Sequence, residues 1–181
     1  MLCNRLARSS SMIYQLRDYL PIHVLKKIYY AHVLPHINYC NFIWCNTFQT
    51  HLLPLILIHK RIIRNISKAD YYAHTEPLYQ NLRILNIENI RKLNLALLMF
   101  KNRQTNEYNI PMLTPHHHYH TRHREQLLIP LHRTTLHSNS FCIQAVRFWN
   151  QIPLEIKNSR TFNTFKHKMK NYLYCNASHN D

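Results

Sequence analysis

The sequence predicts a mainly α protein: a helical bundle followed by a smaller, partly irregular C-terminal unit that ends in a helix. Apolar residues recur at spacings of three and four along much of the chain, which is the period of a helix that buries one side. Hydrophobic residues make up 46% of the 181 positions, enough for a folded core. We expect a helical region at 1–104, a linker with a histidine-rich loop at 105–118, and a C-terminal unit at 119–181.

Two helices are expected near the N-terminus. The apolar stripe of the first consists of Leu2, Leu6, Ser9, Ile13, Leu16 and Leu20. Pro21 opens the second, because a proline in the first position of a helix loses no hydrogen bond. The apolar side of this second helix consists of Ile22, Leu25, Tyr29 and Val33. Pro35 is expected to end or kink it, and the aromatic segment 36–47 fits either a strand or a helical turn.

The clearest helix follows, and its apolar side consists of Leu52, Leu55, Ile56, His59, Ile62, Ile63 and Ile66. Lys60, Arg64 and Lys68 recur at i, i+4 and i+8 on another side, with Arg61 beside them. A helix that buries one face and offers spaced cations on the other can follow a phosphate backbone. An ordinary solvated basic face is the alternative interpretation.

Further helices are expected at Glu76 to Leu82, after Thr75 as N-cap, and at 87–103. The last helix places four apolar residues together: Phe162, Phe165, Met169 and Tyr172. Lys166 and Lys170 lie outside this stripe, so base stacking or phosphate contact competes there with simple core packing.

Between these helices, the aromatic block around Trp149 is best explained by packing, because large aromatic rings bury much area. Asn150, before Gln151 and Pro153, is expected in a turn held by side-chain hydrogen bonds.

The charge balance points to a polyanionic partner. Twenty-three Lys and Arg residues face eight Asp and Glu residues, a formal net charge of +15. The excess is spread along the chain, with +9 in residues 1–110 and +6 in residues 111–181. Basic proteins of this kind bind polyphosphate because neutralising phosphates releases condensed counterions.

Several enzyme classes are excluded. The chain has no glycine, whereas phosphate-binding loops, dinucleotide fingerprints and nucleophile elbows need one where the backbone turns tightly or approaches a ligand. The three aspartates, Asp18, Asp70 and Asp181, are far apart in sequence, so no pair is placed to hold two catalytic cations. We expect no catalytic residues.

Metal binding is the weaker reading of the histidines and cysteines. His116 to Arg124 contains five histidines, but neighbouring residues rarely converge on one ion, so a basic loop carrying Arg122 and Arg124 is favoured. His32, His36, Cys40 and Cys45 form a second candidate, which Pro35 interrupts; a buried structural pair near Trp44 is favoured there.

Cellular location is read from the cysteines and the apolar runs. The odd set Cys3, Cys40, Cys45, Cys142 and Cys175 and the polar start of the chain indicate free thiols in an intracellular setting, cytoplasmic or nuclear. No apolar run is long enough to span a membrane.

A series of different short motifs follows in a fixed order along the chain. In the C-terminal half they are Tyr119-His120-Thr121-Arg122, Arg133-Thr134, Ser140, Arg147-Phe148-Trp149-Asn150-Gln151-Ile152-Pro153 and Phe165-Lys166. In the N-terminal half they are Leu6-Ala7-Arg8, Tyr19-Leu20-Pro21, Ile28-Tyr29, Leu34 to Tyr39, Trp44, Lys60 to Arg64 and Leu82 to Leu85. Their order and spacing, over about residues 2–173, resemble the thumb and post-thumb C-terminal region of reverse transcriptases from non-LTR retrotransposons (jockey-like LINE elements).

This resemblance implies a role in holding RNA template and RNA–DNA duplex through the backbone. It places Lys60, Arg61, Arg64 and Lys68 in a polymerase thumb, followed as candidate contacts by Arg122, Arg124, Lys166 and Lys170. The family's catalytic Asp pair is absent, so this chain would not polymerise alone; the magnesium ions and the palm domain would belong to the rest of the polymerase, and no cofactor is expected here. The alternative is a non-enzymatic relic or a co-opted protein-interaction module.

Overall fold

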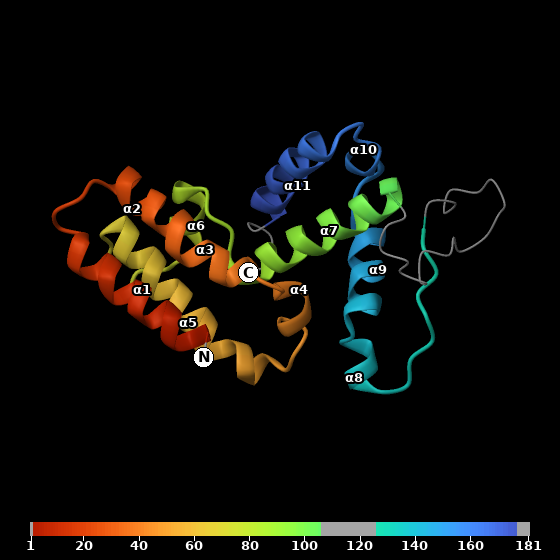
Figure 1. The fold of residues 1–181 in the computed structure, drawn as a ribbon, viewed down its shortest axis with the longest axis horizontal. Helices are drawn as coiled ribbons and strands as arrows, with labels where there is room; N and C mark the ends of the chain where they lie inside the picture. The colour runs from red at the N-terminus through yellow and green to blue at the C-terminus, as the bar shows by residue number, and fades with distance from the viewer. Residues whose placement is uncertain (1, 106–125, 177–181) are drawn as a thin grey trace. The chain divides into compact units, whose positions relative to one another are not determined.

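The computed structural model describes residues 2–105 and 126–176 (Figure 1). These residues form helices, turns and extended segments but no β-strand, and the last element is the helix α11, Phe162–Asn176. The expected mainly helical class and the C-terminal helix are therefore confirmed. None of the helices in these two ranges is both long enough and apolar enough to cross a membrane.

Packing divides the chain into two units, one of residues 1–91 with 174–181 and the other of residues 92–173. The division falls inside helix α7, Ile87–Thr105, whereas the sequence placed its first boundary after residue 104. The linker expected at 105–118 lies almost entirely outside the described residues, so the boundaries drawn from sequence stay predictions. Each unit is described separately below.

The first unit is built on helices α1, Leu2–Leu16, and α5, Gln49–Ser67, which lie side by side and run in the same direction (Figure 1). Parallel neighbours need a long connection, and the helices between them supply it. α1 buries Leu6, Ser10 and Ile13, close to the stripe read from sequence, and it ends before Leu20.

Pro35 changes the helix type without ending the helical path. Helix α2, Ile22–Ile28, passes directly into a π-helical turn, Tyr29–Val33, and then into α3, Leu34–Asn38. In this wider turn the Leu34 N–H donates to the Tyr29 carbonyl. The extra residue per turn makes room for the proline ring, which would otherwise clash with a carbonyl in the preceding turn.

The segment 36–47 is helical, which settles the choice left open by its sequence. It comprises the end of α3 and the single turn α4, Asn41–Trp44, separated by Cys40 in a left-handed conformation. The Trp44 indole N–H donates to the Tyr39 carbonyl at 2.8 Å, so the aromatic side chain secures the turn.

Helix α6, Glu76–Leu82, has the expected bounds. Thr75 occupies the N-cap position, but its side chain makes no capping hydrogen bond. Tyr79 and Leu82 are its buried residues, and Tyr79 reaches the buried face of α5.

A chain of polar groups runs through the core where these helices meet. The His59 ring is completely buried on α5, with its Nε2 atom 3.0 Å from the Tyr29 hydroxyl and its Nδ1 atom 2.9 Å from the Tyr79 hydroxyl. A neutral imidazole has one N–H donor and one acceptor nitrogen, so one tyrosine accepts from His59 while the other donates to it. This arrangement joins the π-helical turn, α5 and α6 with both ring nitrogens satisfied.

The second unit has an aromatic core shared by α7, α9 and α11. Phe100 of α7 stacks on Phe165 of α11, with ring centroids 4.2 Å apart and planes 12° from parallel. Trp149 of α9, Phe141–Gln151, lies against the same phenylalanine at 6.0 Å. Met169 and Leu173 continue the buried side of α11, so the aromatic block is core as expected. The short helices α8, Thr135–Ser138, and α10, Leu154–Lys157, flank α9.

Asn150 was expected in a turn, and this expectation is wrong. It lies inside α9, and the chain leaves the helix only after Gln151. Its side-chain amide pairs with the backbone of Leu127, accepting from the N–H and donating to the carbonyl, both at 3.0 Å. The predicted side-chain hydrogen bonds exist, but they bind an extended segment 23 residues away, a pairing that local turn propensities do not reveal.

Two helices of the first unit end without the glycine that this position favours. Lys68 and Arg83, with φ of 54° and 50°, adopt the left-handed conformation at the ends of α5 and α6. The next residues, Ala69 and Ile84, donate to carbonyls five residues earlier at 3.0 Å, as in a Schellman motif. A side chain with a Cβ atom costs about 1–2 kcal/mol in this conformation.

Replacing Arg83 by glycine should therefore stabilise the protein. We expect Arg83→Gly to raise the free energy of unfolding by roughly 0.5–1 kcal/mol, which is the relieved strain less the entropy cost of glycine in the unfolded chain. Arg83→Ala is the matched control, because it removes the same exposed side chain but keeps the Cβ atom. Equal stabilities of the two variants in urea titrations would contradict this account.

The buried His59 should make stability depend on pH. Desolvation lowers its pKa from 6.5 to about 3, so between these values the unfolded chain binds a proton that the folded protein excludes. Stability is then lost as pH falls below about 6.5, at up to about 1.4 kcal/mol per pH unit from this group. His59→Gln keeps hydrogen-bonding atoms but does not titrate, so its unfolding free energy between pH 7 and 4.5 should fall less steeply. Parallel curves for the two proteins would show that His59 is not the titrating group.

Candidate nucleic-acid interface

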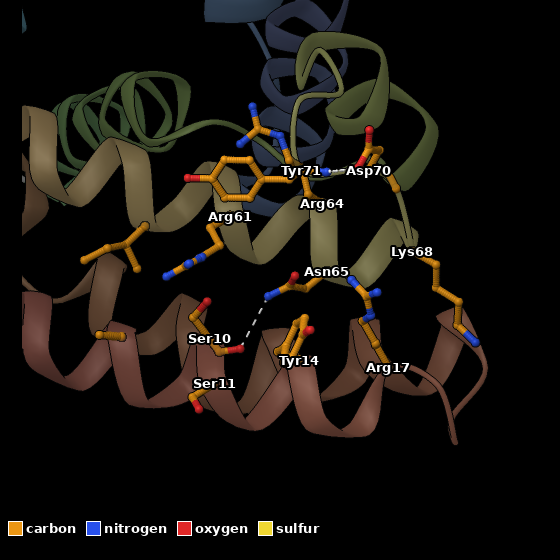
Figure 2. A pocket seen from close by; sticks show the side chains of 13 residues that line it. Ser10, Ser11, Tyr14, Arg17, Arg61, Arg64, Asn65, Lys68, Asp70 and Tyr71 are labelled. Atoms are coloured by element: carbon orange, nitrogen blue, oxygen red, sulfur yellow. Dashed lines mark hydrogen bonds between the residues drawn. The ribbon is translucent and has the colours of Figure 1, made fainter.

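A groove of about 740 Å³ lies between α1 and α5 and is closed at one end by the loop that follows α5 (Figure 2). Asn65 of α5 donates to the Ser10 carbonyl of α1 at 3.5 Å and so bridges the two helices. Ala7 and Ile58 belong to its apolar lining. The groove lies entirely within the first unit, and its walls are fixed by the packing of these two helices.

Four side chains that line the groove carry a positive charge: Arg17, Arg61, Arg64 and Lys68. Among the lining residues the only carboxylate is Asp70, which accepts from the Tyr71 backbone N–H at 2.7 Å. Arg17 has an additional ion pair with exposed Asp18, at 3.4 Å between Nε and Oδ1. A concave surface with this excess of cations attracts anions, since field lines concentrate in a groove with low-dielectric walls.

Three of the four cations are positioned by local features, each of a different kind. The Arg64 Nε donates to the Ala73 carbonyl at 2.9 Å, which fastens the loop to α5. The Arg17 guanidinium carbon lies 4.8 Å from the centre of the Tyr14 ring, a cation–π contact along α1. Lys68 is placed at the groove because α5 ends there in the left-handed conformation. Arg61 is exposed on the last turns of α5.

The expected row of cations along α5 is not a single helical row. α5 ends at Ser67, so Lys68 belongs to the cap, and Lys60 is half-buried and is not among the residues that line the groove. Arg61, beside the expected row, does line it. The structure therefore gathers three of the four residues singled out in this helix and sets Lys60 apart.

The remaining candidates lie elsewhere. Lys166 is exposed on α11 in the second unit, and Lys170 one turn later is half-buried. Desolvation, with a smaller contribution from Lys166, lowers the pKa of Lys170. Arg122 and Arg124 lie outside the described residues, as does the histidine-rich segment 116–123.

Three groove residues were missed by sequence reasoning: Arg17, Tyr14 and Tyr71. Arg17 follows the end of α1, and its spacing from Tyr14 at i+3 was the one local signal that joined these two residues. Nothing in the sequence pattern indicates that α1 and α5 lie parallel, which brings their C-terminal ends to the same place. Tyr71 belongs to the loop that the Arg64 contact with Ala73 fastens to α5.

In residues 2–105 and 126–176, no three His, Cys, Asp or Glu side chains come together as metal ligands would. The candidate set of His32, His36, Cys40 and Cys45 is accordingly not assembled. Only Cys45 of the four is buried, so the buried pair expected there is wrong as well. Burial raises the pKa of Cys45 to about 12, so this thiol stays protonated at neutral pH. All five cysteines are free.

No protein-family model, curated protein or solved structure matches this chain.

Proposed function

We propose that this chain is a nucleic-acid-binding segment equivalent to the thumb and post-thumb region of a non-LTR retrotransposon reverse transcriptase. It would hold RNA template and RNA–DNA duplex for a catalytic palm that lies outside this sequence. Two independent lines support the proposal: the ordered series of family-like motifs, and the cationic groove between α1 and α5.

The observation that carries the proposal is the convergence of cations from separate parts of the chain. Arg17 comes from the end of α1, Arg61 and Arg64 from α5, and Lys68 from its cap. On an ordinary solvated surface, repulsion favours cations that are spaced apart. Here four cations line one groove, and Asp70 is the one carboxylate among the lining residues. Contacts of this kind bind the phosphate backbone and carry no sequence information.

The strength of such binding should depend steeply on salt, because each neutralised phosphate releases condensed counterions. Sequence changes in the oligonucleotide should matter little by comparison.

Two charge-matched double variants test this site. Replacing both Arg61 and Lys68 by glutamine should weaken binding to an RNA–DNA duplex and reduce the slope of log K against log salt by about 2, because two phosphate contacts are lost. Replacing both Lys60 and Lys27 by glutamine removes the same amount of charge outside the groove. This variant should keep a slope close to that of the unchanged protein. Fluorescence anisotropy at several salt concentrations gives both quantities.

Equal loss in the two double variants would mean that overall charge, and not the groove, binds the nucleic acid. An unchanged protein that binds neither RNA nor RNA–DNA duplex at low salt would contradict the proposal itself and favour the alternative, a relic or protein-interaction module.

A further inference from the structure

Two aromatic rings stand among the cations of the groove. Tyr14 projects from α1 and Tyr71 from the loop after α5, so they belong to different walls (Figure 2). Their exposed fractions are 56% and 62%, whereas core tyrosines such as Tyr29 are inaccessible to solvent. Packing therefore does not account for the placement of these two rings.

The two rings are not equivalent. The Arg17 guanidinium covers one face of Tyr14, which makes that ring a support for a cation. Tyr71 meets Tyr72 in a T-shaped contact, with centroids 5.1 Å apart and planes at 88°. An edge-to-face contact covers at most one face of a ring, and Tyr71, which is 62% exposed, lines the groove together with the cations.

Tyr71 is also held in place. Its N–H donates to the Asp70 side chain, and the Ala73 N–H donates to the Asp70 carbonyl at 3.1 Å, forming a tight turn. The Arg64 bond to the Ala73 carbonyl fastens this turn to α5. Tyr71 and Arg64 thus belong to one small, hydrogen-bonded turn, and little ordering of its backbone is required when a ligand binds.

The ligand that fits this combination has phosphates next to an accessible base face. In a duplex the bases are stacked inside and the protein meets phosphates, sugars and groove edges. An unpaired nucleotide offers its face, and stacking of a base on an aromatic side chain contributes about 1–3 kcal/mol whatever the base. We propose that the groove binds single-stranded nucleic acid, with a base stacked on Tyr71 and the adjoining phosphates held by Arg61, Arg64 and Lys68. This inference rests on the proposed function: the groove cations can contact the backbone of a duplex as well, and stacking on Tyr71 is added where the nucleic acid is unpaired.

The test compares Tyr71→Leu with three oligonucleotides of equal length: a single-stranded RNA, the same strand with abasic sites, and an RNA–DNA duplex. Leucine keeps apolar bulk but lacks a π face, so affinity for the single strand should fall about 5- to 150-fold, the equivalent of one stacked base. The slope against salt should stay the same because no charge is lost. The abasic strand should bind both proteins alike.

Two further variants act as controls. Tyr19→Leu changes another exposed ring, which is 85% exposed and is not part of the groove lining, and should leave affinity unchanged. Tyr71→Phe keeps the π face and should bind the single strand nearly as well as the unchanged protein.

The outcomes separate the two proposals. If Tyr71→Leu binds the single strand normally while the Arg61 and Lys68 double variant does not, the stacking site is wrong and the phosphate-binding groove stands. If Tyr71→Leu weakens duplex and single strand equally, Tyr71 acts only by supporting its loop, which also overturns the stacking site. If the unchanged protein binds none of the three oligonucleotides, the proposed function itself fails.

Discussion

The groove depends on a buried hydrogen-bond chain that it does not touch. His59 binds the hydroxyls of Tyr29 and Tyr79 through both of its ring nitrogens, and so sets the rotation of α5 about its own axis. Burial raises the pKa of both tyrosines and keeps the imidazole neutral, so none of the three side chains in this network carries a charge. A buried polar network with every member satisfied rigidifies its surroundings. The side of α5 opposite this network is then free to carry cations.

The second constraint is the absence of glycine from the whole chain. Helices that would normally end in glycine end here in Lys68 and Arg83, at some cost in backbone energy. At the end of α5, the residue that stands in the position usual for glycine is Lys68, which is also one of the cations that line the groove. Helix termination and charge placement are thus performed by the same residue.

The sequence predicted most helices because their apolar periodicity is local, and α6 has the expected bounds. It did not predict how Pro35 is accommodated, since the π-helical turn buries its own residues Tyr29 and Val33 in tertiary contacts that have no local signature. It also misplaced Asn150, whose partner is distant in sequence. For the site, the charges of α5 were visible as a pattern, but Arg17 and Tyr71 were not. Their contribution depends on parallel helix packing and on one loop contact, neither of which has a local signature.

The most direct test of the central claim is to locate the bound nucleic acid on the protein. Arginines can be labelled with phenylglyoxal and quantified by mass spectrometry, with and without a single-stranded RNA. The account predicts that Arg17, Arg61 and Arg64 become protected, while exposed Arg83, outside the groove lining, is labelled equally in both samples. Binding of the RNA without protection of the three groove arginines would contradict it.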